Sequence, residues 1–287
     1  MDNRLIVPKE EIANFMNGGQ MNQQYGIQVF CEMDKEEAQA LLPPPLKILD
    51  KGPGIGALVY IYIVNIREPS FAPWYMEGGI GIMARHGEAV GVHFIGLQLS
   101  GPGALMGMCS GRETSGLPKK LCERIHVERV GDVGHCFIER NGVRLIDVEL
   151  EMGQYNEPGM KLLTGAQEGC TKESPIETGG ACLLFKYQFE EKKFANLVMN
   201  YYDNPTRYYE WSPATAKVTL GSTRDDPWGE IKIKKVFGAG WMVSDNWVRS
   251  NQVIHQYADE EITEVLPYLF SGRYDRFTMC KDHQIYE

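Results

Sequence analysis

The stretch that decides the fold class is residues 136–150, which read CFIERNGVRLIDVEL. Asn141 and Gly142 stand between two runs of β-type residues, 136–140 and 143–150. An Asn-Gly pair favours the positive backbone angles of a type I′ turn and is the strongest short signal of a β-hairpin. The second run largely alternates apolar and polar side chains, so we expect a strand with one face in solvent.

Strand-like segments continue on both sides of this hairpin. Residues 58–66 form a continuous apolar run rich in β-branched and tyrosine side chains, which is typical of a strand buried on both faces, and residues 92–99 are similar. Shorter β-type segments stand at 183–189, 195–200, 216–220 and 231–237. Many short strands without long helices between them predict a mainly β (α+β) protein, an antiparallel barrel or sandwich with few helices.

Two helices are signalled. Asp34 can cap a short helix over 34–42, Glu37 stands at its third position as in a capping box, and three prolines, 43–45, end it. A second helix is expected over 259–270, with an acidic first turn, apolar residues on one face, and a bend or break at Pro267.

The domain organisation is expected to be one domain over 1–287. No Gly/Ser-rich linker divides the chain, and no repeat recurs at a period of 20–50 residues. The loosest stretch, 153–180, is rich in Gly, Pro, Thr and Glu, and strands are expected on both sides of it. We therefore interpret it as a long excursion of one domain over a site.

Charge and cysteine content exclude several classes. The 29 Lys and Arg against 38 Asp and Glu give a net charge of −9, so no basic field favours nucleic acid or an anionic membrane. Seven cysteines without a CxxC pair fit a reduced, cytoplasmic protein better than a disulfide scaffold. The first eight residues lack the apolar core of a signal peptide, and no apolar run approaches the length of a membrane span, so we expect neither export nor an anchor.

Several familiar site patterns are incomplete. The glycine clusters at 52–56 and 101–107 complete neither GxGxxG nor a phosphate loop, so we interpret them as turns. The six histidines show no metal-binding spacing, and His93 in an apolar strand is more often a core side chain than a ligand. No GxSxG elbow is present for a serine hydrolase. We expect no metal and no cofactor.

The informative segment is residues 111–120, GRETSGLPKK. Two adjacent lysines are ordinarily a solvated turn, but Lys119 and Lys120 stand between apolar residues and follow Pro118, so both can be held against a core. An amine attacks carbonyls only when neutral, and desolvation or a second ammonium nearby disfavours its charged form. A solvated turn and an activated nucleophile both stay open at this point.

At these residues the chain resembles the acetoacetate decarboxylase-like superfamily. Its signature is Gly-Arg-Glu followed after a short gap by Pro-Lys-Lys, which residues 111–113 and 118–120 reproduce. Residues 41–46, 74–78, 141–153 and 214–244 are also similar, so the resemblance covers roughly nine-tenths of the chain. It implies a closed antiparallel β-barrel or cone with peripheral helices, and an oligomer of identical subunits.

The resemblance also assigns roles to individual residues. It implies that Lys119 forms the Schiff base, that Lys120 is the neighbour that lowers its pKa, and that Glu77 is the active-site glutamate. Within the same motifs we expect Trp74, Tyr75, Arg112 and Glu113 at the substrate-binding site.

Two departures from the family pattern bear on the reaction. The decarboxylases carry an arginine before the first helix that helps to bind the substrate carboxylate, and residues 18–25 contain none. A second family glutamate falls near Tyr62 by spacing. Both losses leave imine formation possible and argue against acetoacetate itself as the substrate.

The expected function is that of a lyase that forms a lysine Schiff base with a keto acid or ketone and decarboxylates a β-keto acid. The imine accepts the electron pair of the bond that breaks, and Glu77 is the general acid and base. One alternative is a Schiff-base aldolase-dehydratase acting on a keto acid and an aldehyde. An alternative from another class is a non-catalytic β-barrel that binds a small apolar ligand.

Overall fold

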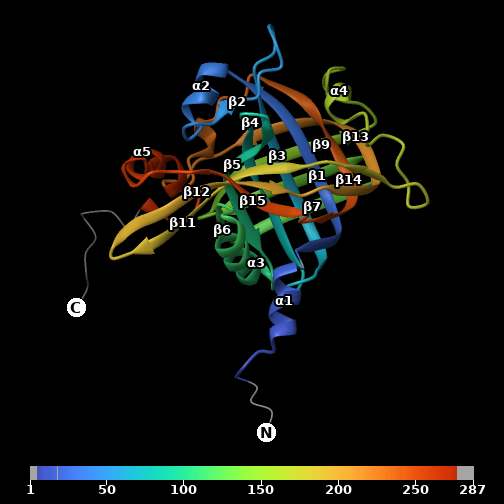
Figure 1. Cartoon of the computed structure of the whole chain (residues 1–287). Coiled ribbons are helices and arrows are strands. Elements are labelled where there is room, and N and C mark those ends of the chain that lie inside the picture. Colours follow the sequence, from blue (N-terminus) through green and yellow to red (C-terminus); the bar gives the residue numbers. More distant parts are fainter. Residues whose placement is uncertain (1–4, 18, 277–287) are drawn as a thin grey trace.

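The computed structural model describes residues 5–17 and 19–276, and strands dominate it. All fifteen strands of this part of the chain belong to one sheet (Figure 1). They are β1 (Gln20–Met33), β2 (Lys47–Ile48), β3 (Ala57–Pro69), β4 (Tyr75–His86), β5 (Ala89–Ser100), β6 (Lys119–Leu121), β7 (Arg124–Val130), β8 (Val133–Arg140), β9 (Val143–Met152), β10 (Ile176–Thr178), β11 (Ala181–Glu190), β12 (Lys193–Asp203), β13 (Thr206–Leu220), β14 (Lys235–Trp247) and β15 (Ser250–Gln256). The mainly β prediction is confirmed.

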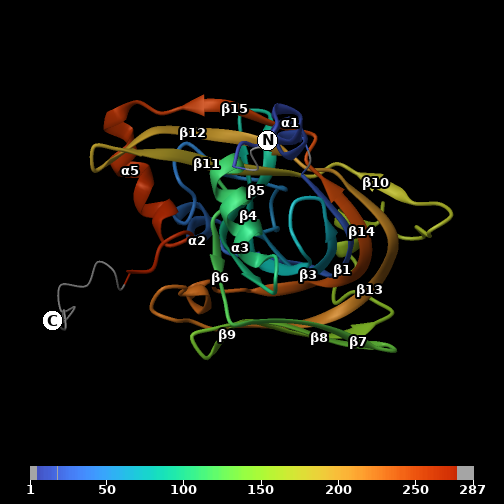
Figure 2. The ribbon, with the colours of Figure 1, turned by 90° about the horizontal axis from the view of Figure 1, so that it is seen from below.

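Helices are short and lie at the periphery of the sheet (Figures 1 and 2). They are α1 (Lys9–Asn17), α2 (Lys35–Ala40), α3 (Ala104–Ser110), a π-helical turn (Gly111–Ser115), α4 (Met160–Thr164), a 3-10 turn (Trp228–Glu230) and α5 (Asp259–Phe270). None of the helices in the described ranges has the length and apolar character needed to cross a membrane.

The sheet is strongly curved but not closed. Its main path runs β15-β12-β11-β5-β4-β3-β1-β14-β13-β9-β8-β7, and within the described ranges the two end strands, β15 and β7, do not pair with each other. Figure 2 shows β7, β8 and β9 as a layer on one side of the molecule and β11, β12 and β15 on the opposite side. The closed barrel implied by the resemblance is therefore not confirmed.

Face-to-face packing explains why the β7 end stays open. Ile138 of β8 belongs to the same buried cluster as Ile61 of β3 and Ile80 of β4. A Cβ atom added to Gly78 of β4 would lie 3.0 Å from the Ile138 Cδ1 atom. The β7–β9 layer thus covers the outer face of β3 and β4 and buries its apolar side chains there, so its free edge does not reach β15.

The hairpin prediction is confirmed, with β8 and β9 paired antiparallel around Asn141 and Gly142 at φ angles of 52° and 71°. The helix over 259–270 is α5, and Pro267 lies inside it. Asp34 caps α2 by accepting hydrogen bonds from the Glu36 and Glu37 backbone amides. The Glu37 carboxylate, however, pairs with Lys232 at 3.4 Å.

One strand prediction was largely wrong. Residues 231–234 are not strand, and β14 begins only at Lys235. The alternation of Ile231 and Ile233 with lysines has another cause, because Lys234 pairs with Asp34 at 2.8 Å at the start of α2. The alternating isoleucine and lysine residues therefore hold a loop in place and do not form a strand.

Other expectations from the sequence can be compared with the structure directly. The 52–56 and 101–103 glycine clusters lie in turns, as predicted, whereas Gly107 lies in α3, so the turn prediction was wrong for 104–107. His93 is buried, and its Nδ1 atom lies 3.3 Å from the Leu183 carbonyl oxygen, so it is a core side chain. The six cysteines in the described ranges are free thiols, and Cys280 lies outside those ranges. Segment 153–180 contains α4 and β10.

Candidate active site

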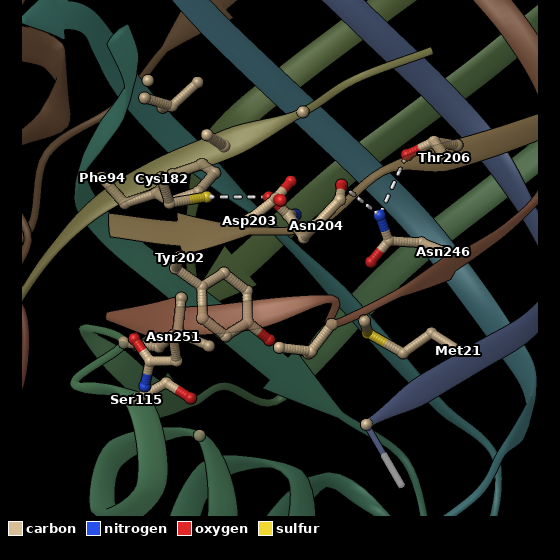
Figure 3. A pocket seen from close by; sticks show the side chains of 18 of the residues that line it. Met21, Phe94, Ser115, Cys182, Tyr202, Asp203, Asn204, Thr206, Asn246 and Asn251 are labelled. Atoms are coloured by element: carbon tan, nitrogen blue, oxygen red, sulfur yellow. Dashed lines mark hydrogen bonds between the residues drawn. The ribbon is translucent and has the colours of Figure 1, made fainter. Parts of the chain in front are cut away.

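The inner side of the curved sheet encloses a cavity of about 1090 Å³. Strands β1, β3, β4 and β5 form one wall, and β6, β10 to β15, α3, the π-helical turn and the segment of α4 contribute the rest. Figure 3 shows Tyr202 of β12 with its ring extended across this space and Ser115 of the π-helical turn below it. Two of the residues that the sequence selected, Lys119 and Glu77, line the cavity.

Lys119 and Glu77 form a buried ion pair. The Lys119 Nζ atom lies 2.7 Å from the Glu77 Oε2 atom, and the two residues are 3% and 5% exposed. The same amine also lies 3.4 Å from the Gly107 carbonyl oxygen of α3. The structure thus brings the predicted nucleophile and the predicted acid/base into direct contact, away from solvent.

The Gly-Arg-Glu and Pro-Lys-Lys segments hold this lysine in place. A Cβ atom added to Gly111 would lie 3.0 Å from Lys119 Cδ and Cε and 3.1 Å from Nζ, so the glycine leaves room for the lysine side chain. Arg112 donates from Nε to the Lys119 carbonyl oxygen at 2.7 Å. Gly116, at a φ of 85°, ends the π-helical turn in the left-handed conformation that glycine adopts most readily.

Tyr62 completes the contacts of the Glu77 carboxylate. Its hydroxyl donates a short hydrogen bond to Glu77 Oε1, so each carboxylate oxygen has a different partner. Burial and the negative charge of Glu77 raise the pKa of Tyr62 well above its ordinary value. The tyrosine therefore stays protonated and remains a hydrogen-bond donor at neutral pH.

Lys120 does not share this environment. Successive residues of a strand point to opposite faces, and Lys120 directs its amine away from the cavity. Its Nζ atom lies 2.6 Å from Asp226 Oδ1, 3.2 Å from Asp275 Oδ1 and 3.1 Å from the Asp225 carbonyl oxygen. Arg140 joins both Asp226 and Asp275. The predicted role as the neighbour of the Lys119 amine is not supported, because two carboxylates neutralise the Lys120 charge on the other face.

The four residues expected at the substrate-binding site do not line the cavity. Trp74 is 45% exposed and Glu113 is also exposed. Tyr75 is completely buried beside α3, close to Gly107. Arg112 bonds to the Lys119 and Arg273 carbonyl oxygens, and burial followed by the charge of Arg273 lowers its pKa. Arg112 and Tyr75 therefore lie outside the cavity lining, where they support the residues of the site and do not contact a ligand.

Sequence reasoning missed most of the polar residues that face the cavity. They include Gln24 and Gln28 of β1, Ser115, Tyr202, Tyr208 and Gln167. By its spacing from Glu77, Tyr62 stands where the family resemblance places a glutamate. Tyr60 and Tyr62 alternate with isoleucines in β3, and this two-residue periodicity was the available signal that one face of the strand is polar.

The chain is similar to several known proteins. A family model for acetoacetate decarboxylase matches residues 6–258. The chain is 30% identical over 277 residues to the CLA biosynthesis isomerase of Lactiplantibacillus plantarum, with 94% of each protein covered.

Solved structures are also similar in fold, among them the following two. Acetoacetate decarboxylase from Legionella pneumophila matches with a TM-score of 0.66 and 16% identity, over 84% of this chain and 88% of that one. The enduracididine biosynthesis enzyme MppR, complexed with the condensation product of pyruvate and imidazole 4-carboxaldehyde, matches with a TM-score of 0.62 and 12% identity, over 90% and 94%. Because the family model matches most of the sequence, over a range that includes residues 111–120, the chain belongs to the acetoacetate decarboxylase family.

Proposed function

We propose that Lys119 forms an imine with a ketone substrate and that Glu77 moves a proton between carbon atoms of that imine, so that the enzyme isomerises an unsaturated ketone. The observation that carries the proposal is the contact of 2.7 Å between the Lys119 amine and the Glu77 carboxylate on the cavity wall. The 30% identical isomerase of L. plantarum supports the reaction class.

The ion pair supplies both groups that imine formation needs. Transfer of one proton from Lys119 to Glu77 leaves a free amine and a neutral carboxylic acid. The amine attacks the carbonyl carbon, and Glu77 returns the proton to the oxygen, which leaves as water. The products of this step are a protonated imine on Lys119 and a Glu77 carboxylate beside it.

The same carboxylate can then complete an isomerisation without an outside proton. Glu77 removes a proton from the carbon next to the imine, and the electron pair moves into the imine to give an enamine. If a carbon–carbon double bond lies one position further along, Glu77 can return the proton to the far end of the extended enamine. The double bond then lies next to the imine carbon, and hydrolysis releases the isomerised ketone and the Lys119 amine.

The charges in the cavity favour proton transfer over decarboxylation of a small keto acid. Among described residues, the cationic side chains on the cavity wall are Lys119, Lys186 and Arg249. Lys119 is paired with Glu77, and Arg249 pairs with Asp203 at 2.7 Å. A carboxylate one carbon from the imine would therefore lie beside the Glu77 anion, and Lys186 of β11 is the one cation on the described wall that has no carboxylate partner.

Decarboxylation of a larger β-keto acid is the second candidate. The family match favours it, and the imine accepts the electron pair of the bond to the departing carbon dioxide. A cavity of about 1090 Å³ has room for a substrate far larger than acetoacetate, whose apolar body can contribute binding energy. The aldolase-dehydratase alternative uses the same enamine and needs an aldehyde as second substrate.

Borohydride trapping tests the imine. The protein is reduced in the presence of a β,γ-unsaturated ketone, a longer β-keto acid or pyruvate, and the modified peptide is identified by mass spectrometry. We expect a single modified residue, Lys119, and no modification in Lys119→Ala. Lys186→Ala is the matched control, because this lysine also lines the cavity and its removal should leave trapping intact.

The reaction class is read separately, in parallel incubations. Enone absorbance from the unsaturated ketone supports isomerisation, carbon dioxide from the keto acid supports decarboxylation, and a conjugated product from pyruvate with an aldehyde supports aldol-dehydration. Binding of these ligands without trapping in the unmodified protein would contradict the imine and favour the non-catalytic barrel.

A further inference from the structure

A second polar cluster lines the cavity. Its residues come from segments other than β4 and β6, which carry the ion pair. Gln28 of β1, Tyr208 of β13 and Gln167, which follows α4, are 9%, 3% and 8% exposed. All three belong to the cavity wall. Gln28 Nε2 donates to the Tyr208 hydroxyl at 3.0 Å, and that hydroxyl lies 3.2 Å from Gln28 Oε1, to which it can donate.

One acceptor in this cluster has no partner. Tyr208 has one hydroxyl proton and two lone pairs. Gln28 contacts this hydroxyl through both of its amide atoms, and Gln167, Thr178 and Thr206 are its further side-chain hydrogen-bond partners. Among the described residues, the Gln167 Oε1 atom is buried without a hydrogen-bond partner. A buried polar atom left in this state costs about 1–3 kcal/mol, which a ligand that donates to it would recover.

The strand order sets the spacing between the backbones that carry Gln28 and Glu77. Gln28 is directly opposite Tyr62 in the β1–β3 pairing, and Tyr62 contacts Glu77 of β4. Strands β1 and β4 are thus two strand spacings apart, or roughly 10 Å. A ligand that reaches both the Lys119 amine and the Gln28 amide must place several carbon atoms between its two polar groups.

Charge and donor count restrict what the cluster can bind. None of the three cationic side chains on the described cavity wall comes from β1, β13 or the 153–180 segment, so a carboxylate would lack a counter-charge here. A ketone or ester oxygen cannot donate to Gln167. An alcohol can donate to the Gln167 oxygen and accept from a neighbouring amide at the same time.

We propose that Gln28, Tyr208 and Gln167 form a hydroxyl-binding subsite, which selects ketones that carry an alcohol several carbon atoms from the reacting carbonyl. The proposal rests on the proposed function, because the imine at Lys119 fixes where the carbonyl lies. Segment 153–180, which carries Gln167, thereby contributes to specificity rather than only covering the cavity.

Paired ketones test the subsite. Methyl ketones of ~6 to ~12 carbon atoms, chains that span the roughly 10 Å separation, are compared with the same ketones bearing a terminal hydroxyl. Half-saturation concentrations are measured by borohydride trapping with intact-protein mass spectrometry and, without reduction, by calorimetry. We expect the hydroxyl to lower the half-saturation concentration about tenfold at one or two chain lengths, as one well-placed buried hydrogen bond predicts.

Variants test whether these three residues cause the preference for the hydroxy ketone. Gln167→Leu removes the unpartnered acceptor, and Tyr208→Phe removes the hydroxyl while keeping the ring. In both, the preference for the hydroxy ketone should fall to within about twofold. Gln188→Leu is the matched control, because Gln188 also lines the cavity but bonds to Asn196 of the β11–β12 pair. The tenfold preference should persist in it.

The outcomes separate the two proposals. Equal half-saturation concentrations for each pair at every chain length, or a preference that survives both Gln167→Leu and Tyr208→Phe, overturns the subsite and leaves the imine untouched. A hydroxyl preference seen by calorimetry without any trapping supports the subsite and contradicts the imine at Lys119.

Discussion

The Lys119 amine and the Glu77 carboxylate lie 2.7 Å apart although β5 stands between their strands. Lys119 is opposite Leu97 in the parallel β5–β6 pairing, and Glu77 is opposite Leu99 in the antiparallel β4–β5 pairing. The two side chains therefore meet over β5, inside the cavity. Tyr62 holds the other oxygen of the same carboxylate, so Glu77 is fixed from both sides.

Tyr62→Phe tests whether this fixation matters for proton transfer. The imine needs only the Lys119 amine and a proton from Glu77, so trapping should persist. Exchange of the proton next to the imine should slow by about 10²-fold, a typical contribution of a positioned acid or base. Exchange into deuterated water is followed by NMR on a saturated ketone.

The matched control for this variant is Tyr60→Phe, two residues away on the same strand. The pKa of Tyr60 is also raised well above its ordinary value by burial, but Tyr60 has no Glu77 contact. If Tyr62→Phe loses both imine trapping and proton exchange, the tyrosine serves the fold of the site rather than proton transfer.

Lys120→Met tests the role that the family resemblance implies. If the Lys120 charge promoted the free-amine form of Lys119, its removal would move imine formation to higher pH. Since Lys120 is paired with Asp226 and Asp275 on the opposite face, we expect the pH profile of trapping to coincide with that of the unmodified protein.

The same variant should lose stability. Breaking a buried ion pair costs roughly 3–5 kcal/mol, and here it leaves the Asp226 carboxylate with the Arg140 guanidinium and the Gln98 amide as its remaining side-chain partners. Lys186→Met, a partly exposed lysine with no ion pair on the described residues, should stay within about 0.5 kcal/mol in denaturant unfolding. A shifted pH profile with unchanged stability would restore the role first expected of Lys120.

The sequence determined the elements whose signals are local. The Asn141-Gly142 turn and the acidic start and apolar face of α5 depend on neighbouring residues, and both were predicted correctly. Helix α3 was not predicted, because it has no side-chain cap and contains a glycine. The openness of the sheet depends on packing of β7–β9 over β3 and β4, which no local pattern encodes.

The residues of the site divide in the same way, into those with a local sequence signal and those that depend on the fold. Lys119 and Glu77 were named from motifs, and their contact was the part that only the fold could supply. The orientation of Lys120 follows from strand alternation once β6 is known, but a three-residue strand after a proline gives no periodicity to detect. Gln167 and Tyr208, from distant segments, meet only in the folded chain.

His93 should make the fold sensitive to acid. Burial lowers the pKa of His93 to about 4, against an ordinary value of 6.5. Between these two pH values the unfolded chain binds a proton that the folded chain excludes, so stability falls as pH is lowered through this window and levels off below it. The full effect is on the order of 3 kcal/mol.

Denaturant unfolding at several pH values checks this for the unmodified protein and His93→Gln. The variant should be less stable at neutral pH but should lose less stability between pH 6.5 and about 4. Parallel curves for the two proteins would assign the acid sensitivity to other groups.

Gln24→Arg tests why acetoacetate is expected to be a poor substrate. Residues 18–25 lack the arginine of the decarboxylases, and from this stretch Gln24 lines the cavity, 7% exposed, with its amide donating to Ser244 Oγ at 2.9 Å. A guanidinium there would supply the cation that a substrate carboxylate lacks. Charge-assisted hydrogen bonds contribute about 1.5–3 kcal/mol, so the half-saturation concentration for acetoacetate should fall by roughly 10- to 100-fold.

Carbon dioxide release gives the measurement, and Gln24→Met, which has similar length and no charge, is the control. If the unmodified protein already decarboxylates acetoacetate rapidly, or if Gln24→Arg and Gln24→Met respond alike, the missing arginine is not what limits this substrate.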